Sequence, residues 1–236
     1  MDKPKIYRFN ELESTNEYIK QHLDSLPDKA IVIANTQTKG RGRNQHIWVS
    51  ANPDNLYFSF HLRLSNQAIA SLPTLTHFLA LVSANVLDIY LKGTPWKVQI
   101  KWPNDLFLSE YKMGGILAEA IWIHNRIAGI ALGIGINLSI SQDEKERINQ
   151  PVSDLRSFSR SNLNKETIFQ EIVQAFLDRV DQYLTDGFDS IREEYEKKMI
   201  LQIGSKQYRL QDDGSVVVKE EGKKPYHLIN PIDNGN

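Results

Sequence analysis

Residues 113–138 read MGGILAEAIWIHNRIAGIALGIGINL, and this stretch decides the class of fold. Two apolar runs, 113–123 and 126–138, flank His124-Asn125, a pair of residues suited to a tight turn. The pattern predicts a long antiparallel β-hairpin. Residues 106–108, directly before it, predict one more strand in the same succession. We therefore expect a sheet built mainly from antiparallel neighbours.

Further strands are predicted on the N-terminal side of this hairpin. Short apolar or alternating runs indicate strands at residues 6–9, 30–34 and 98–102. Leucine and phenylalanine alternate with other residues along 56–64, which predicts a strand with one buried face. The polar, glycine-bearing stretch 35–50 predicts a long loop.

Two apolar stripes at helical spacing predict long helices, at residues 71–92 and 165–184. Ser14 followed by Glu17 matches a capping box and predicts the start of a shorter helix. Strands and helices do not alternate regularly, as they would in a doubly wound sheet. The fold class predicted is α+β, with a mixed, mainly antiparallel central sheet.

The chain changes character towards its C-terminus. Residues 188–198 predict a helix, and residues 203–210 and 215–218 predict short strands around the hairpin signal Asp212-Asp213-Gly214. We expect a main domain over 1–187, followed by a linker helix and a small β domain over 188–236. The charged stretch 141–150 predicts a surface loop.

Length and composition exclude several classes of protein. The 236 residues are 41% hydrophobic and 24% charged with a formal net charge of −1, unlike a protein that coats nucleic acid. No cysteine is present, so disulfides, zinc–thiolate sites and cysteine nucleophiles are excluded. The first residues lack the apolar core of a signal peptide, and no run approaches about 18 apolar residues. We expect a cytoplasmic protein without a membrane-spanning helix.

Three short segments carry the candidate chemistry: 39–43 (KGRGR) with Trp48, 101–105 (KWPND) and 112–115 (KMGG). Their glycines let backbone N–H groups approach an anion closely, their lysines and arginines neutralise it, and Trp48 offers a flat face for a nucleobase. Taken singly, they are explained at least as well by a solvated basic loop, a self-capped Asn-Asp turn and a β-bulge. Together they suit an anionic substrate and phosphate chemistry, with Asp105 as a base or metal partner.

In this order the segments resemble the biotin protein ligase family, over about residues 5–185. The matching motifs are STN at 14–16, KGRGR at 39–43 with Trp48, KWPND at 101–105, KMGGILAE at 112–119 and GIGIN at 133–137. The resemblance implies a class II synthetase-like fold of the biotin and lipoate ligase type, with helices on one face of the sheet and an SH3-like C-terminal unit. Because the chain begins shortly before Ser14, it also implies the form without an N-terminal DNA-binding domain, and no DNA partner is expected.

The activity implied by the resemblance is that of an ATP-dependent biotin–[acetyl-CoA-carboxylase] ligase. The biotin carboxylate attacks the α-phosphate of ATP and releases pyrophosphate, and a lysine of a carrier domain then attacks the biotinyl-5′-AMP. ATP and Mg²⁺ are the implied cofactors, and biotin is the substrate. Joining two anions requires fixed cations and a divalent metal, and a glycine-rich loop is suited to shielding the adenylate from water.

The resemblance also assigns roles to individual residues, without naming metal ligands. The biotin contacts are Ser14, Thr15, Gln37, Gly40, Arg41, Lys112 and Gly115. The ATP contacts are Arg43, Trp48, Asn104 and Asn137. The catalytic residues are Lys112, Arg43, Asp105 and Lys101, with Asp105 as the candidate base for the incoming lysine.

The expected partner is the biotin carboxyl carrier domain of a carboxylase; the resemblance also allows a homodimer and implies no membrane. Two features depart from the family's pattern: His46-Ile47 replaces a common arginine before Trp48, and 200–236 matches the C-terminal barrel poorly. One alternative is lipoate or octanoate ligation, which does not share the basic loop with its tryptophan. The other is a non-catalytic biotin- or nucleotide-sensing module, which would tolerate the loss of Lys112.

Overall fold

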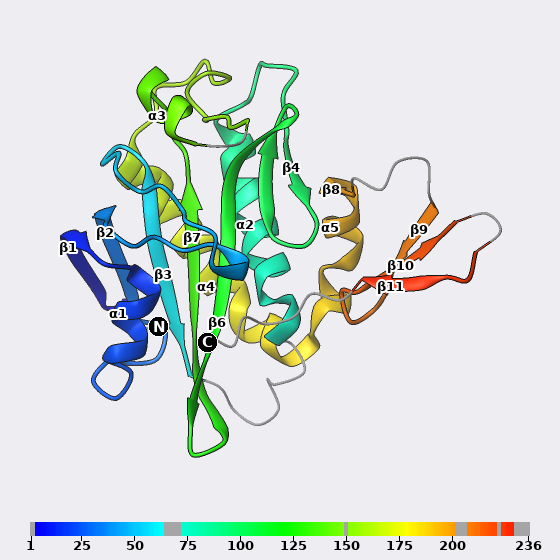
Figure 1. The fold of residues 1–236 in the computed structure, drawn as a ribbon, viewed down its shortest axis with the longest axis horizontal. Coiled ribbons are helices and arrows are strands. Elements are labelled where there is room, and N and C mark those ends of the chain that lie inside the picture. The colour runs from blue at the N-terminus through cyan, green and yellow to red at the C-terminus, as the bar shows by residue number, and fades with distance from the viewer. Residues whose placement is uncertain (1–2, 64–71, 149–150, 202–206, 221–222, 229–236) are drawn as a thin grey trace.

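A computed structural model describes residues 3–63, 72–148, 151–201, 207–220 and 223–228. Within these residues one large sheet has the strand order β1-β2-β3-β7-β6-β5-β4-β8 (Figure 1). Its strands are β1 (Ile6–Leu12), β2 (Ile31–Gln37), β3 (Leu56–Leu62), β4 (Val98–Lys101), β5 (Asp105–Leu108), β6 (Tyr111–Ile123), β7 (Arg126–Ile136) and β8 (Met199–Ile200). In this part of the chain the edge pairs β1–β2 and β4–β8 are parallel, and the other pairs are antiparallel. The predicted mainly antiparallel sheet is confirmed.

The predicted hairpin is the longest pair of neighbours in this sheet. β6 and β7 pair from Gly114 opposite Ile136 to Ile123 opposite Arg126. His124 and Asn125 form the turn with φ values of 45° and 63°. Two successive residues with positive φ match the twist of a two-residue hairpin turn, so the hairpin prediction is confirmed.

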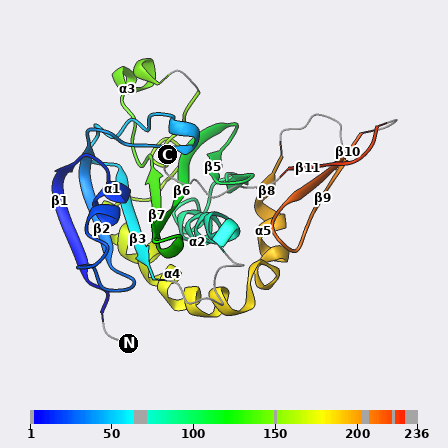
Figure 2. The same ribbon diagram turned by 60° about the horizontal axis from the view of Figure 1, so that its bottom comes forward.

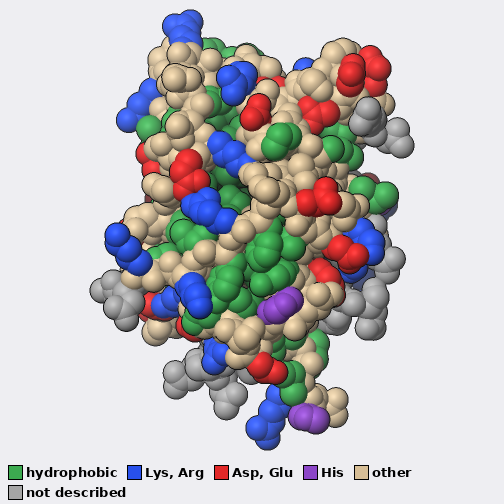
Figure 3. Space-filling model, turned by 90° about the vertical axis from the view of Figure 1, so that its left-hand side faces the viewer, with side chains coloured by type: hydrophobic (Ala, Val, Ile, Leu, Met, Phe, Trp, Pro, Cys, Tyr) green, Lys and Arg blue, Asp and Glu red, His purple; other side chains and the backbone are tan. Residues whose placement is uncertain are grey.

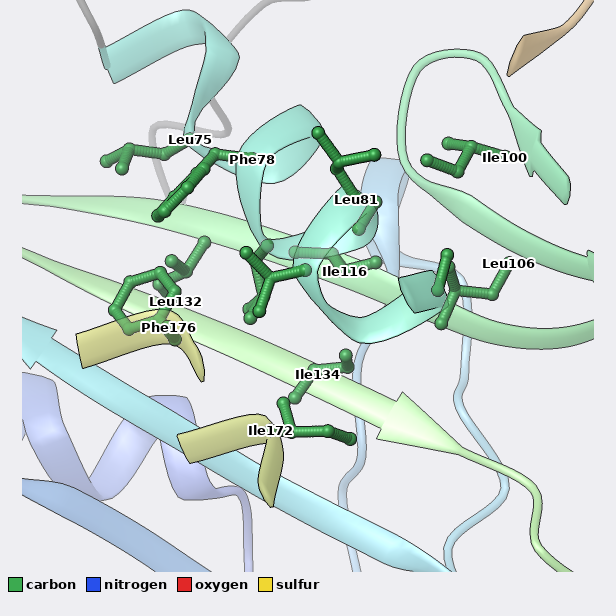
Figure 4. Close-up of a cluster of buried hydrophobic side chains, with 14 of the residues drawn as sticks. Leu75, Phe78, Leu81, Ile100, Leu106, Ile116, Leu132, Ile134, Ile172 and Phe176 are labelled. Atoms are coloured by element: carbon green, nitrogen blue, oxygen red, sulfur yellow. The ribbon is translucent and has the colours of Figure 1, made fainter. Parts of the chain in front are cut away.

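The two long helices cover one face of the sheet. These are α2 (Leu75–Ile89) and α4 (Lys165–Asp186), and Figure 2 shows both on the same side. Figure 4 shows Phe78 of α2 and Phe176 of α4 close to Leu132 of β7. Residues 72–89 are apolar and long enough to cross a membrane by composition alone, but they are mostly buried in the protein, as expected of a core helix.

A short helix, α1 (Thr15–Gln21), packs on the opposite face. Ser14 caps it as predicted, accepting a hydrogen bond from the Glu17 backbone N–H at 3.5 Å. Ile19 of α1 packs with Val32 of β2 and Ala131 of β7. The residues directly before and after Val32 and Ala131 in sequence point to the other face, into the core with α2. The prediction of helices on one face therefore holds for the long helices, and α1 adds a partial second layer. Figure 3 shows the surface on the β1 side, where charges of both signs surround a hydrophobic patch.

The second layer corrects one prediction about β3. Every residue of Leu56–Leu62 is buried, so the expected half-buried strand is wrong. The alternate positions, such as Ser59 and His61, lie under α1 and the loop that follows it. Residue 64, which was included in the predicted strand, lies outside the described residues.

The predicted surface loop at 141–150 contains a helix, α3 (Gln142–Arg147). Ser141 and Glu144 form a full capping box, and Asn52 donates to the Glu144 carboxylate at 3.0 Å. Capping and this tertiary contact hold a six-residue helix that has no apolar stripe. The loop prediction was therefore wrong for these residues.

The C-terminal part begins with a 3₁₀ turn, η3 (Phe188–Ser190), and α5 (Arg192–Lys198), where one helix was predicted. A small antiparallel sheet follows, formed by β9 (Gln207–Leu210), β10 (Val216–Lys219) and β11 (Tyr226–Leu228). Residues 203–206 of the predicted strand lie outside the described residues, and β11 was not predicted. Leu210 and Val216 join the main hydrophobic core. The domain boundary at 187 and the SH3-like closure stay predictions.

Candidate active site

A cavity of about 1030 Å³ opens on the α1 side of the sheet, beside the hairpin. Its walls come from the start of α1, the end of β2, the loop with the 3₁₀ turn η1 (Arg43–Gln45), the turn before β5, and strands β6 and β7. The lining residues include Ser14, Thr15, Asn16, Gln37, Arg41, Arg43, Trp48, Asn104, Asp105, Lys112, Gly115, Leu117, Gly133 and Gly135. Segments far apart in the sequence therefore meet in one place.

Glycines in β6 and β7 form the floor of this cavity. A Cβ atom added to Gly135 would lie 2.5 Å from Nε1 of Trp48, and one added to Gly115 would lie 3.4 Å from the same indole. A side chain at residue 135 would collide with the ring, so the glycine is what lets the loop tryptophan pack against the strand. The structure places Trp48 over these glycines.

The cationic side of the cavity is organised by the turn that follows the cis Trp102–Pro103 peptide bond. The Lys112 ammonium lies 2.8 Å from the Asp105 carboxylate and 5.4 Å from the centre of the Trp48 ring. Arg43 donates to Oδ1 of Asn104 at 3.2 Å. Four residues predicted from three separate motifs are thus brought together: Lys112, Asp105, Arg43 and Asn104.

Asn104 fixes this turn to β6. Its side-chain Nδ2 donates to the Ile116 backbone carbonyl at 2.6 Å, and its backbone carbonyl accepts from the Ile116 N–H at 2.9 Å. The side chain is buried, so both atoms of its amide are used by the protein. Its role in the structure is to hold the turn and to orient Arg43.

The polar side of the cavity lies at the start of α1. The Thr15 backbone N–H donates to Oε1 of Gln37 at 2.8 Å, and Nε2 of Gln37 donates to Ser50 at 3.0 Å. Ser14 and Thr15 are both buried. Ser14, Thr15 and Gln37 line the cavity with hydroxyl and amide groups, and the biotin contacts assigned to them stay predictions.

Three predicted site residues are not among those that line the cavity. A Cβ atom on Gly40 would lie 2.4 Å from the Trp48 carbonyl, so this glycine permits close packing at the base of the loop. The Lys101 ammonium lies 5.1 Å from the centre of the Phe107 ring. Asn137 is buried and donates to the Ser153 carbonyl at 3.4 Å. The ligand contacts assigned to these three residues stay predictions.

A charged cluster next to the polar side of the cavity was not predicted from the sequence. Lys20 lies 3.1 Å from Glu119 and 2.9 Å from Glu17, and Glu17 lies 4.0 Å from Arg41. Burial alone would lower the pKa of Lys20, but the hydrogen bonds and charges of Glu17 and Glu119 more than offset this and raise it. A glutamate within the apolar stretch 116–123 was the available signal, because carboxylates are rarely buried without a partner.

The arrangement can hold a ligand with a polar ring at one end and an anion at the other. Arg41, Arg43 and Lys112 supply cations for phosphate or carboxylate groups. Asp105 is the carboxylate among the lining residues. In the described part of the chain, no group of three or more His, Cys, Asp or Glu side chains is placed to hold a metal ion.

Solved structures share this fold. The biotin protein ligase from Aquifex aeolicus in complex with biotin and ATP superposes with a TM-score of 0.78, at 22% identity, over 95% of both chains. The Leishmania major biotin protein ligase in complex with biotinyl-5-AMP superposes with a TM-score of 0.61, at 19% identity, over 96% of this chain and 99% of that one. At these identities the likeness establishes the fold, which is that of the biotin protein ligases.

The sequence itself establishes the family. Residues 9–137 match the model of the biotin/lipoate A/B protein ligase family, and the chain belongs to that family. It is 31% identical over 186 residues to the bifunctional ligase/repressor BirA of Escherichia coli, covering 79% of this chain and 56% of that protein. It is 30% identical over 183 residues to the biotin–[acetyl-CoA-carboxylase] ligase of Paracoccus denitrificans, covering 76% and 75%. The chain spans about half the length of the BirA relatives.

Proposed function

We propose that this protein is an ATP-dependent biotin protein ligase. It would form biotinyl-5′-AMP and transfer the biotinyl group to a lysine of a biotin carboxyl carrier domain. The observation that carries the proposal is the convergence of Lys112, Arg43 and Asp105 at one side of a cavity whose other side presents Thr15 and Gln37. The names of the Paracoccus denitrificans and Escherichia coli relatives support the same reaction class.

In the first step an oxygen of the biotin carboxylate attacks the α-phosphorus of ATP, and the bond to pyrophosphate breaks. Both reactants are anions, so fixed positive charge near the forming bond lowers the barrier. Lys112 is suited to hold the carboxylate against the α-phosphate, with Arg43 on the phosphate oxygens. Because Lys112 is paired with Asp105 in the structure, an arriving anion would exchange with that carboxylate as the ammonium's partner.

In the second step the amine of a carrier lysine attacks the carbonyl carbon of the mixed anhydride, and AMP leaves. A lysine amine has an ordinary pKa of about 10.4, so a base near the reaction centre must take its proton. Asp105 lines the same cavity and is our candidate for that base.

Replacing Asp105 by asparagine tests this role. We expect biotinyl-5′-AMP to form, while transfer from preformed adenylate to a carrier domain slows by about 10²–10⁴-fold, the usual contribution of a general base. Rapid quenching of single turnovers measures both steps. The matched control is Glu110→Gln, which alters an exposed carboxylate close in sequence. A transfer rate equal to that of the control would remove Asp105 from the role.

Magnesium would reach the cavity with the nucleotide. Mg²⁺ commonly keeps several waters and binds through one or two carboxylates plus substrate phosphates, which fits a lining with Asp105 as its carboxylate. We also propose that the partner is the carrier domain of a carboxylase and that the protein acts in the cytoplasm. We further propose that two copies of the chain associate as a homodimer, which sedimentation would measure.

A competition tests the whole proposal. Purified protein is incubated with Mg·ATP and equal amounts of biotin, lipoate and octanoate, and the acyl-adenylates are identified by mass spectrometry. We expect biotinyl-5′-AMP, and its loss in Lys112→Met but not in the control Lys92→Gln, which alters an exposed lysine. Lipoyl-AMP instead would assign the lipoate activity named in the family's description, and octanoyl-AMP would assign octanoate ligation. Bound biotin without any adenylate would indicate a sensing module.

A further inference from the structure

Glu119 is a buried carboxylate that the proposed reaction does not use. It lies on β6, is 4% exposed, and is not among the residues that line the cavity. A buried carboxylate is costly unless it is paired and hydrogen-bonded. Lys20 lies 3.1 Å from one of its oxygens, and Nδ2 of Asn16 donates to the other at 2.8 Å. The carboxylate is therefore satisfied, and it acts on its surroundings through Asn16.

From Asn16 a chain of buried hydrogen bonds leads to the cavity. Oδ1 of Asn16 lies 2.6 Å from the hydroxyl of Ser59, which lies 2.7 Å from the hydroxyl of Thr15. All three side chains are buried, and Thr15 lines the cavity. Nδ2 of Asn16 also reaches the Leu117 and Ala131 carbonyls at 3.4 and 3.5 Å, longer contacts than the one to Glu119. The shortest contacts thus connect Glu119 to Thr15 through two intermediates.

The carboxylate makes the shortest of the three contacts that set the direction of the hydrogens, and the Leu117 and Ala131 carbonyls support the same orientation of Asn16. A carboxylate only accepts, so Asn16 must turn its NH₂ towards Glu119 and its Oδ1 towards Ser59. Oδ1 also only accepts, so Ser59 must use its single hydrogen on Asn16. The Ser59 oxygen is then left as an acceptor for the hydroxyl of Thr15.

The last link decides what Thr15 offers to a ligand. Its hydroxyl hydrogen has two acceptors within reach, Ser59 at 2.7 Å and Oε1 of Gln37 at 3.2 Å. Gln37 already receives the Thr15 backbone N–H at 2.8 Å, so the shorter contact to Ser59 is the better one. With its hydrogen directed to Ser59, Oγ1 of Thr15 presents only lone pairs to the cavity.

We propose that Glu119 is a positioning residue that sets the direction of this hydrogen-bond chain and makes Thr15 a hydrogen-bond acceptor for the ligand. The chain selects a ligand ring that carries an N–H group, such as the urea of biotin, over one without it. The inference rests on the proposed function. A site built to accept a hydrogen bond discriminates strongly against analogues that lack the donor, because its buried acceptor is left unpaired.

Replacing Glu119 by glutamine tests the proposal. The amide can present NH₂ to Asn16, which favours reversed hydrogens on Asn16, Ser59 and Thr15 at the loss of only the two long contacts to the Leu117 and Ala131 carbonyls. The probes are biotin and the two carbamate analogues in which one ring N–H is replaced by oxygen, with Kd measured by calorimetry. We expect the wild type to prefer biotin over at least one analogue by about 100-fold, and Glu119→Gln to reduce this preference at least tenfold. KM for biotin should rise, with kcat changed less than threefold.

A double-mutant cycle separates this role from a structural one. Thr15→Val removes the hydroxyl with little change in shape, so Glu119 has nothing left to act through. We expect Glu119→Gln to change the biotin preference less than twofold in the Thr15→Val background. Independent, multiplicative effects of the two substitutions would overturn the proposal.

Two further variants keep the test decisive. Asp88→Asn is the matched control. Asp88 is a largely buried carboxylate that lies 2.6 Å from the Lys198 ammonium, and it is not among the residues that line the cavity. This substitution should leave the biotin Kd unchanged. If Glu119→Gln does not fold, Ser59→Ala interrupts the same chain without touching the carboxylate. It should lower the preference by a smaller factor, because Gln37 remains as an acceptor for the Thr15 hydrogen, and an unchanged preference would overturn the proposal. If the wild-type protein binds no biotin, the proposed function is refuted. If the wild-type protein binds biotin and the variants keep the same preference for biotin over the analogues, the role of Glu119 is refuted.

Discussion

The two faces of the large sheet bury different chemistry. Towards α2 and α4 the core is aliphatic and aromatic, and the rings of Phe60 and Phe176 stack with their centres 4.1 Å apart. Towards α1 the hydrophobic cluster is small, and it borders the buried polar side chains of Asn16, Ser59 and Glu119. Buried polar groups stabilise a fold only when each is satisfied. We therefore expect the face towards α2 and α4 to supply most of the stability and the face towards α1 to supply the groups for recognition.

The largest expected effect lies on the α2 side. Phe176→Ala removes a fully buried ring between Phe60 and Phe78, and we expect a loss of about 3–5 kcal/mol in the free energy of unfolding. Urea denaturation measures it, with Ile172→Val as a milder control at about 0.5–1.5 kcal/mol. Biotin affinity of the folded fraction should stay unchanged. A large change in affinity would break the division between the faces.

The matching test on the α1 side is Gly133→Ala. The added methyl would lie 2.4 Å from Oδ1 of Asn16, so Asn16 must move. We expect a stability loss of about 1–3 kcal/mol, as for other overpacked sites, and a fall in biotin affinity of at least tenfold. At Gly42 the nearest atom to an added Cβ is 3.6 Å away, so Gly42→Ala should change stability by less than about 0.5 kcal/mol. Equal stability losses in the two variants would contradict the crowding at Gly133.

His77 is a polar exception on the α2 side. Burial lowers the pKa of its imidazole from 6.5 to about 3, despite the Gly214 carbonyl, which favours the charged form. Between these values the unfolded chain binds a proton that the folded protein does not, so stability falls as pH falls below about 6.5. The slope reaches about 1.4 kcal/mol per pH unit.

Unfolding in urea at several pH values between 7 and 5 tests this expectation. The wild type should lose stability with falling pH more steeply than His77→Asn, which cannot take up the proton. Parallel curves would show that His77 is not the group responsible.

The smallest expected effect is at the surface, where Arg8 of β1 meets Glu166 of α4 with contacts of 3.0 and 2.6 Å. Both side chains are about half exposed, so a double-mutant cycle should give a coupling of only about 0.2–1 kcal/mol that weakens in high salt. A coupling above about 2 kcal/mol would mean that this ion pair holds β1 to α4 more strongly than its exposure suggests.

The sequence predicted the parts of the fold that have a clear period. The hairpin and the long helices were correctly placed because their apolar spacing is regular over many residues. The burial of β3 was underestimated because Ser59 and His61 look outward-facing in an alternating pattern, and nothing local shows that α1 lies over them. β8 was missed because two residues carry no period, and its pairing with β4 is a long-range contact.

The candidate site was predicted where motifs coincide with the cavity and missed where side chains turn elsewhere. Lys112 and Asp105 meet as an ion pair, whereas Lys101, in the same motif as Asp105, contacts Phe107. Position within a motif does not show the direction of a long side chain. Glu119 is the last residue of the motif KMGGILAE at 112–119. Its proposed positioning role depends on Asn16 and Ser59, which only the fold brings close to it.

The short strand β8 affects which parts of the protein unfold together in local fluctuations. The Trp102 backbone N–H donates to the Ile200 carbonyl, and its indole donates to the Gly214 carbonyl, both at 3.0 Å. Both bonds come from the residue that leads into Asn104 and Asp105. Regions that unfold together exchange their amide hydrogens together. We therefore expect the Trp102 amide to share the free energy of opening of the amides in β9 and β10, so that the small C-terminal sheet and the cationic side of the cavity open as one unit.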